Sequence, residues 1–377
     1  MSSPMKAVVT SFGTSLHQAL TRATHLLSQL LFLFWTAFLT YRNGPYYTLL
    51  ELCRNYQLFG YRKLTYEQEF KTPLEGRTCV ITGGTRGIGL EVVRFLFSKG
   101  ATIVTGTSTL PADASPDSIA QYKATLLRQI LQVSGPEKGT ATTLDATSAE
   151  YARYAQRLVV FPLDLTSMSS VVSFAAQISS VVTQIDYLVS GSILKATFSL
   201  SNHSHHHSQI CNGGVMFVPF RLTRDKFECH MSINYLSHCL LILKLLPLLA
   251  QRPSPSPSTS ANNNKSTKSR IVIVSSGAHH ASLGLRLHDL HSTSLYSVYH
   301  GYAQSKLSLV MFTYCLDRWL TTAKSTTLRP YITVNCLHPG VCRTGLMERF
   351  NFFKLKFIQE TPLFRVSDEI GFNEEIN

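Results

Sequence analysis

Tyr302 and Lys306, in the stretch YAQSK, are the residues of this sequence best spaced to move a proton. Residues four apart share one face of a helix, so the lysine ammonium can lie beneath the phenol. A free phenol has a pKa of about 10 and is a poor acid or base at neutral pH, whereas a neighbouring ammonium lowers that pKa. No other tyrosine has a lysine at the fourth position. A solvated lysine on a helix surface is the alternative.

Upstream of this pair, the run RIVIVSS (270–276) is rich in β-branched residues and ends in Ser275 and Ser276. Such a run is typical of a buried strand. The sequence therefore predicts two hydroxyl groups at a strand end, ahead of the helix that carries Tyr302.

The first elements that would position these residues begin at Arg77. RTCVIT (77–82) predicts a buried strand, TGGTRGIG (82–89) a glycine-rich loop, LEVVRFLFSKG (90–100) a helix, and ATIVTG (101–106) a second strand. Glycines let backbone N–H groups approach a pyrophosphate at a helix N-terminus. A lone glycine-rich loop also serves ordinary turns, but this order of elements favours a dinucleotide site.

The end of the second strand bears on which dinucleotide binds. NAD-selective sites usually place an acid there, and 105–109 reads TGTST, without one. Arg86, inside the loop, can meet a 2′-phosphate bidentately, or it is simply a solvated arginine. NADP(H) is therefore expected, with NAD(H) as the alternative.

From about Arg77 to Thr344 the chain resembles the short-chain dehydrogenase/reductase family. The motifs that carry the resemblance are the TGxxxGxG loop Thr82–Gly89, Asp164-Leu165, Asn234 in INYLSHCLL, Ser276, the YxxxK pair Tyr302 and Lys306, Pro339-Gly340 and Thr344. The resemblance implies a doubly wound, mostly parallel Rossmann-type α/β sheet with helices on both faces and an oxidoreductase activity.

The resemblance also implies the residue roles. Ser276, with Ser275 as the fallback, and Tyr302 would hydrogen-bond the substrate oxygen; Lys306 would hold the ribose and tune Tyr302, and Asn234 would keep a water in the proton relay. The implied cofactor-binding residues are Gly83, Thr85, Arg86, Gly87, Ile88, Gly89, Asp164, Leu165, Asn212, Gly213, Tyr302, Lys306, Pro339, Gly340, Val341 and Thr344.

Within the family, residues 215–241 and 302–314 are similar to the membrane-anchored branch that contains the retinol dehydrogenases. That similarity implies a lipophilic alcohol or aldehyde as substrate, most simply a long isoprenoid. A retinol or steroid dehydrogenase is the alternative.

An uncharged stretch, 23–41, lies between Arg22 and Arg42. As a helix it would span about 28 Å, close to the hydrocarbon thickness of a bilayer. A secretory signal peptide is the alternative, but no run of small residues follows the stretch. Lysine and arginine are commoner after it than before it, which favours a cytosolic body. We expect the protein to reside in the endoplasmic reticulum membrane, with the lipid droplet as a second location.

The expected organisation is an N-terminal segment 1–22, a spanning or monotopic anchor 23–41, a lead-in 42–76, a Rossmann domain 77–350 and a divergent tail 351–377. Inserts are expected near 111–155, 190–210 and 253–269. The second insert separates the strand DYLV from Asn212-Gly213, and the tail leaves the last family strand without a match. A non-catalytic, membrane-bound product is therefore the competing hypothesis.

Composition excludes several other classes. The formal net charge is +13, but the basic residues are scattered rather than gathered in a stripe, so no nucleic acid is expected. The eight cysteines form no CxxC pair, which favours free thiols. Four histidines at 203 and 205–207 lack acidic or cysteine partners, and no metal is expected. A homo-oligomer is compatible with the sequence.

Overall fold

The computed structural model describes the ranges 73–131, 149–191, 214–251, 268–293, 296–322, 331–339, 342–343 and 365–366, together with residues 27, 30, 31, 34 and 38. The predicted inserts at 190–210 and 253–269 lie largely outside the described residues, as do the four histidines at 203 and 205–207.

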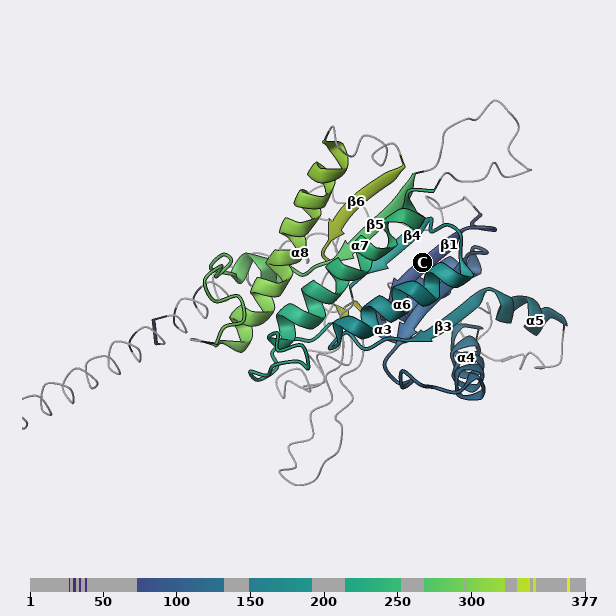
Figure 1. Ribbon diagram of the computed structural model, residues 1–377, viewed down its shortest axis with the longest axis horizontal. Coiled ribbons are helices and arrows are strands. Elements are labelled where there is room, and N and C mark those ends of the chain that lie inside the picture. The colour runs from purple at the N-terminus through teal and green to yellow at the C-terminus, as the bar shows by residue number, and fades with distance from the viewer. Residues whose placement is uncertain are drawn as a thin grey trace, which may run out of the picture.

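A parallel sheet forms the centre of the molecule (Figure 1). Its strands are β1 (Thr78–Thr82), β2 (Thr102–Thr107), β3 (Leu158–Pro162), β4 (Tyr187–Ser190), β5 (Ser269–Val274) and β6 (Ile332–Leu337). They lie in the order β3-β2-β1-β4-β5-β6, and each neighbouring pair is parallel. The strand order reverses between β1 and β4, which is where open α/β sheets bind ligands. The predicted Rossmann-type α/β fold is confirmed.

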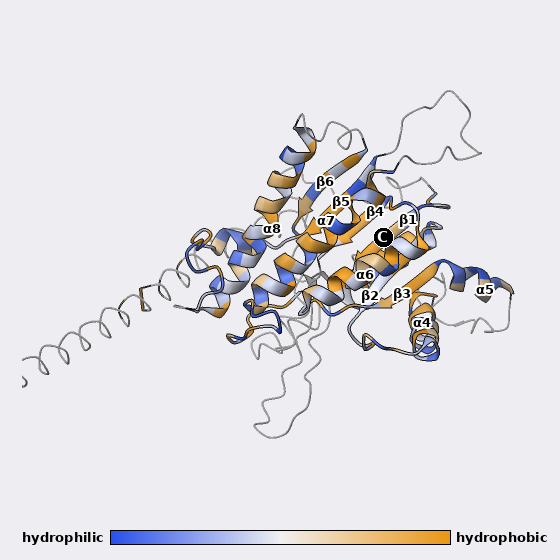
Figure 2. Ribbon diagram, in the orientation of Figure 1, coloured by the Kyte–Doolittle hydropathy of each residue, from blue (hydrophilic) through white to orange (hydrophobic). Residues whose placement is uncertain are grey.

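The middle of the sheet is hydrophobic, as Figure 2 shows. The cores of β1 and β5 read CVI and IVIV, and most of these side chains are buried. A parallel strand covered on both faces requires such a continuous apolar run, rather than an alternating one.

Helices cover both faces of the sheet. They are α3 (Gly87–Ser98), α4 (Pro116–Leu131), α5 (Ala149–Gln156), α6 (Met168–Val181), α7 (Ser237–Leu249) and α8 (Val298–Thr321). On one face, Phe174 of α6, Leu241 of α7 and Leu309 of α8 join one buried cluster. On the other, Phe97 of α3 and Leu127 of α4 join a second. The sheet therefore lies between two hydrophobic cores.

The crossover from β2 to β3 contains the first predicted insert, 111–155. Helix α4 lies within it and covers residues 116–131. Its buried residues Leu126, Leu127 and Ile130 pack into the core beside α3. This part of the excursion therefore extends the core of the domain.

The predicted anchor, 23–41, lies mostly outside the described residues. The five that are described are helical and exposed: Leu27, Leu30, Leu31, Phe34 and Phe38. Elsewhere in the described chain, Met231–Leu249 is long and apolar enough to cross a membrane, but 61% of it is buried. It is a core helix of the Rossmann domain.

Strand β6 lies at one edge of the six-stranded sheet within the described part of the chain. Two short strands, β7 (Cys342–Arg343) and β8 (Arg365–Val366), pair with each other in parallel as a separate ladder.

Candidate active site

Helix α8 carries both members of the predicted proton-transfer pair. It begins after Ser297, whose hydroxyl accepts a hydrogen bond from the His300 N–H at 3.5 Å. Tyr302 and Lys306 are 4% and 1% exposed, and Lys306 Nζ lies 5.8 Å from the centre of the Tyr302 ring. Because Lys306 is buried, the alternative of a solvated surface lysine is excluded.

The two serines after β5 have different partners. The Ser275 hydroxyl donates to the Lys306 carbonyl oxygen at 2.9 Å and so fastens β5 to α8. The Ser276 side chain instead hydrogen-bonds Tyr302. Ser276 also caps the short helix η3 (Gly277–Ala281), where its hydroxyl accepts from the Ala278 N–H at 3.2 Å. The structure therefore brings Ser276, rather than Ser275, to the phenol.

Burial moves the pKa values of the pair in opposite directions. It raises the pKa of Tyr302 to about 12, although the hydrogen bond with Ser276 acts the other way. It lowers the pKa of Lys306 to about 8, against the opposing influence of Cys336. Tyr302 therefore has a raised rather than a lowered pKa, because desolvation of the phenolate dominates.

Lys306 is held at the carboxyl end of the sheet by the backbone of β5. Its Nζ donates to the Val274 carbonyl oxygen at 3.4 Å. This contact directs the ammonium to the carboxyl ends of the strands, where the glycine-rich loop also lies.

Asn234 lies in a wide helical turn, η2 (Met231–Leu236), which has π-helical hydrogen bonds and leads into α7. Its side-chain amide donates to the Val215 carbonyl oxygen and to Ser305 Oγ, both at 2.9 Å, and its Oδ1 accepts from the Val215 N–H at 2.7 Å. Ser305 Oγ in turn donates to the Tyr302 carbonyl oxygen at 2.7 Å. Asn234 thus ties the segment at Val215 to the helix turn that bears Tyr302. π-turns of this kind recur at functional sites.

The glycine-rich loop joins β1 to α3 by a close backbone approach. Gly83 and Gly87 have φ angles of +68° and +54°, which favour glycine. A Cβ on Gly89 would lie only 2.2 Å from the Gly83 carbonyl oxygen, and one on Gly84 would lie 2.8 Å from Thr105 Oγ1. The backbone at the start of α3 is therefore bare, as a pyrophosphate-binding loop requires.

The carboxyl end of β2 has an unsatisfied hydroxyl beside this loop. Thr107 Oγ1 donates to the Tyr122 hydroxyl at 3.1 Å, whereas the buried Ser108 Oγ has no hydrogen-bond partner among the described residues. Half-buried Arg86 precedes α3 and makes no side-chain cap there. This end of the sheet thus offers three kinds of hydrogen-bond donor: backbone N–H groups of the glycine loop, the unpartnered Ser108 hydroxyl and the Arg86 guanidinium. Such donors fit an anionic dinucleotide with a phosphorylated ribose.

Of the ten remaining predicted cofactor residues, the structure describes five and does not describe the other five. Asp164 Oδ1 accepts from the Thr166 N–H and hydroxyl at 2.8 and 2.7 Å, and Leu165 is buried beside it. Thr85 and Ile88 belong to the loop and the start of α3, and Pro339 follows β6. Asn212, Gly213, Gly340, Val341 and Thr344 lie outside the described residues.

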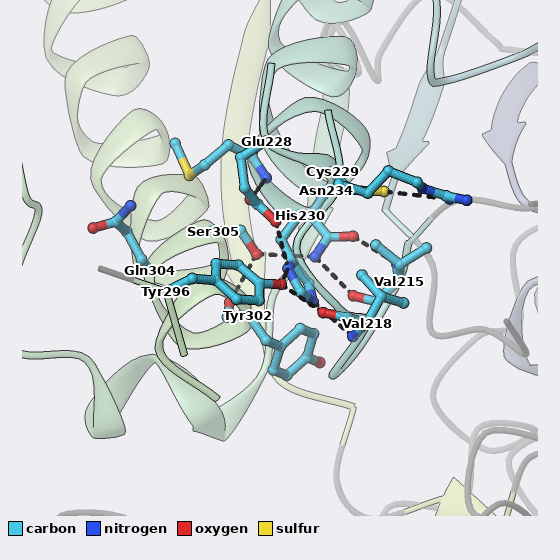
Figure 3. Close-up of polar contacts among 12 residues, drawn as sticks. Val215, Val218, Glu228, Cys229, His230, Asn234, Tyr296, Tyr302, Gln304 and Ser305 are labelled. Carbon is cyan, nitrogen blue, oxygen red and sulfur yellow. Dashed lines mark hydrogen bonds and ion pairs between the residues drawn. The ribbon is translucent and has the colours of Figure 1, made fainter. Parts of the chain in front are cut away.

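Several residues near Tyr302 were not predicted from the sequence. Glu228 and His230 are buried, and they lie near Tyr302 (Figure 3). The His230 and Phe217 rings lie 6.3 and 5.5 Å from the Tyr302 ring, centre to centre. At the end of β4, the Gly191 N–H donates to Thr82 Oγ1 at 3.0 Å. The acid and the histidine in FECHMSI, two ionisable residues in a largely apolar segment, were the available signal.

No metal-binding group of three or more histidine, cysteine, aspartate or glutamate side chains is present in the described part of the chain.

Comparison with known proteins gives named relatives, although no family model matches the chain. Human polyprenol dehydrogenase is 30% identical over 274 residues, which are 73% of this chain and 63% of that protein. The zebrafish (Danio rerio) polyprenol dehydrogenase is 28% identical over 78% of this chain and 69% of its own length. Human retinol dehydrogenase 14 is 29% identical over 72% of this chain and 64% of its own length.

The chain therefore spans less than two thirds of the length of these two human proteins. The aligned relatives carry the names expected from the stretches 215–241 and 302–314. Together with the strand order and the motif positions, they show that the chain belongs to the short-chain dehydrogenase/reductase family, in the branch of the retinol and polyprenol dehydrogenases.

Proposed function

We propose that this protein is an NADP(H)-dependent oxidoreductase that interconverts a lipophilic alcohol and its aldehyde or ketone, with an isoprenoid as substrate. The observation that carries the proposal is the group formed by half-buried Ser276 and by buried Tyr302 and Lys306 at the carboxyl end of the sheet. The names of the relatives, polyprenol dehydrogenase and retinol dehydrogenase, support the substrate class.

When bound, NADP(H) supplies or accepts the hydride. The protein's own residues move the proton. A Tyr302 pKa of about 12 keeps the phenol protonated at neutral pH, so it is ready to donate to the oxygen of an aldehyde being reduced. The Ser276 hydroxyl, which already contacts the phenol, is placed to hydrogen-bond that same oxygen. The protonated phenol is the form that reduction of an aldehyde requires.

Lys306 and Asn234 support Tyr302 as proton donor in different ways. With a pKa of about 8, Lys306 remains mostly protonated at pH 7 and places a positive charge beside the Tyr302 ring. That charge stabilises negative charge that develops on the phenol oxygen as the proton leaves. Asn234, through Ser305, fixes the turn of α8 on which both residues stand.

Two features favour NADP(H) over NAD(H). The sequence has no acid at 105–109, where a carboxylate would hold the ribose diol. Arg86 and the unpartnered Ser108 hydroxyl supply donors in its place. NAD(H) binding at lower affinity is compatible with the same loop.

The membrane assignment rests on the sequence of 23–41 and on its few described residues. The five described residues of this segment, Leu27, Leu30, Leu31, Phe34 and Phe38, are helical, apolar and exposed. We propose that this segment anchors the protein in the endoplasmic reticulum membrane with the Rossmann domain in the cytosol. A lipophilic substrate dissolved in the same membrane would then reach the enzyme without crossing water.

Replacing Tyr302 by phenylalanine tests the catalytic proposal. The substitution keeps the ring and removes the proton donor, so turnover of an isoprenoid aldehyde with NADPH is expected to fall by about 10²–10⁴-fold. Tyr314→Phe is the matched control, because Tyr314 is on the same helix and 74% exposed. Its turnover is expected to equal that of the wild type.

The same assay separates the alternatives. Retinal, offered beside the isoprenoid aldehyde, tests the substrate class that the retinol dehydrogenase relatives favour. Equal background rates in the wild type and in Tyr302→Phe with both aldehydes would establish the non-catalytic hypothesis.

A further inference from the structure

A buried polar cluster lies beside Tyr302 and has no part in the proton transfer just described. Its members are Glu228, His230 and Tyr296, and the first two are 1% and 0% exposed. His230 Nδ1 lies 2.8 Å from Glu228 Oε1 and 3.2 Å from the Tyr296 hydroxyl. Figure 3 shows the His230 ring between Tyr296 and the backbone at Val218.

The other ring nitrogen of His230 fixes where its proton resides. The Val218 N–H donates to His230 Nε2 at 3.3 Å, so Nε2 must be the acceptor. The proton is therefore on Nδ1, from which it is donated to the Glu228 carboxylate. This tautomer follows from the hydrogen bonds around the ring.

Glu228 is the anchor of the cluster. Burial by itself would raise its pKa, but hydrogen bonds from His230 and from the Met231 N–H outweigh burial and hold the pKa below its usual value. The Met231 bond, 2.9 Å to Oε2, fastens the carboxylate to the first turn of η2. The ionised carboxylate thus orients the imidazole from a fixed helix terminus.

The cluster holds both polar backbone atoms of Val218. While His230 accepts from the Val218 N–H, the Tyr296 hydroxyl donates to the Val218 carbonyl oxygen at 2.5 Å. The preceding residue, Phe217, has a φ of +53°, which is uncommon for a residue with a side chain. Strained backbone of this kind persists only where surrounding contacts enforce it, and here the two bonds to Val218 do so.

The enforced backbone directs the Phe217 ring towards Tyr302. The two rings meet edge to face, with centres 5.5 Å apart. The Phe217 ring also packs against Tyr299, with ring centres 4.8 Å apart, and Tyr299 is 48% exposed. Phe217 and Tyr299 therefore form a continuous aromatic surface from solvent to the buried phenol, which we call the aromatic wall.

We propose that Glu228, His230 and Tyr296 are positioning residues that hold Phe217 in place, and that the aromatic wall selects lipophilic substrates with unsaturated chains over saturated ones. The inference rests on the proposed function, because it names the substrate class of the same site. Its chemical basis is the contact of ring faces and edges with the flat double bonds of an isoprenoid, which adds to plain apolar burial.

Binding of two alcohols to the full chain in detergent, with NADPH present, tests the proposal. Geranylgeraniol has four double bonds and hexadecanol none, their main chains are equally long, and neither alcohol can react with the reduced cofactor. The wild type is expected to bind geranylgeraniol more tightly. Phe217→Leu keeps apolar volume but removes the ring, so the Kd of geranylgeraniol should rise roughly fivefold, equivalent to about 1 kcal/mol, with that of hexadecanol within about twofold.

Tyr296→Phe tests the positioning residues. It keeps the ring that packs 5.2 Å from Phe220 and removes only the hydroxyl that holds Val218. It should weaken geranylgeraniol selectively, as Phe217→Leu does, and raise the KM of an isoprenoid aldehyde with kcat within about twofold. Tyr154→Phe is the matched control, because the Tyr154 hydroxyl donates to exposed Glu150 in α5. Both Kd values should stay unchanged.

Three results would overturn the inference: equal affinity of the wild type for both alcohols, an unchanged geranylgeraniol Kd in Tyr296→Phe, or equal weakening of both alcohols in either variant. The Kd values need no turnover. If no aldehyde is reduced but the selectivity and its loss are observed, the proposed function fails and the aromatic wall stands.

Discussion

At the scale of single residues, the burial of Lys306 has a consequence for the pH dependence of the reaction. Its pKa is lowered to about 8, whereas that of Tyr302 is raised to about 12. As the pH rises, Lys306 is therefore the first of the two to lose its proton. The ammonium that stabilises charge on the phenol disappears while the phenol itself is still protonated.

We predict that kcat/KM for aldehyde reduction falls as the pH rises through about 8, since this parameter reports groups of the free enzyme. A kcat/KM profile between about pH 6 and pH 10 measures it. Lys306→Arg keeps the positive charge with a far higher pKa, so its profile should stay flat through that range. A profile that falls at the same pH in both proteins would assign the titration to another group.

The sequence predicted the chemical identity of these residues but not their electrostatic state. The spacing of Tyr302 and Lys306 is a local property of a helix, and it can be read from the letters. The pKa of Tyr302 depends instead on how completely the fold removes water from it, and burial comes from residues distant in sequence. Glu228 and His230 escaped prediction for the same reason, because their partners Tyr296 and Val218 converge only in the folded chain.

At the scale of elements, the loop between β1 and α3 depends on one contact more than on any other. A Cβ on Gly89 would lie 2.2 Å from the Gly83 carbonyl oxygen, and backbone cannot move aside as a flexible side chain can. Gly89→Ala must therefore push the start of α3 away from the loop. We predict a rise of at least about tenfold in the Kd of NADPH, about 1.4 kcal/mol, measured by fluorescence titration.

Gly76→Ala controls for strain alone. Gly76 has a φ of +75°, but a Cβ there would meet nothing within 4 Å. The variant should lose about 1 kcal/mol of stability, as expected for an alanine in this conformation, with an unchanged NADPH affinity. If Gly89→Ala also bound NADPH normally, the loop would not be the pyrophosphate site.

Elements with strong periodic patterns were predicted well, and those that depend on tertiary contacts were not. The strands β1 and β5 followed from runs of β-branched residues, because a fully buried parallel strand has no other composition available. The π-turn η2 has ordinary helical letters, MSINYL. Its widened turn goes with the side-chain bonds of Asn234 to Val215 and Ser305, which no local pattern encodes.

At the scale of the whole molecule, the parallel sheet separates the groups that stabilise it from the groups that do chemistry. The six strands of the central sheet all run in the same direction, so the glycine loop, Ser276 and Lys306 lie together at the carboxyl ends of the strands. At the amino ends of the strands, Asp186 precedes β4 and accepts hydrogen bonds from Arg77 at 2.7 Å and from the Thr78 N–H at 2.8 Å. The fold thus predicts that stability and cofactor binding can be changed independently.

Asp186→Ala tests that separation. The substitution leaves the Thr78 N–H and the Arg77 guanidinium without their acceptor, the buried carboxylate of Asp186. We predict a loss of about 1–3 kcal/mol in the free energy of unfolding, measured by urea titration, because a buried donor without an acceptor retains its desolvation cost. The Kd of NADPH should not change, since the affected strand ends lie away from the glycine loop.

Asp317→Ala is the control, because Asp317 is an exposed aspartate on α8; it should change the free energy of unfolding by less than about 0.5 kcal/mol. If Asp186→Ala lost NADPH affinity as well as stability, the amino and carboxyl ends of the strands would be coupled.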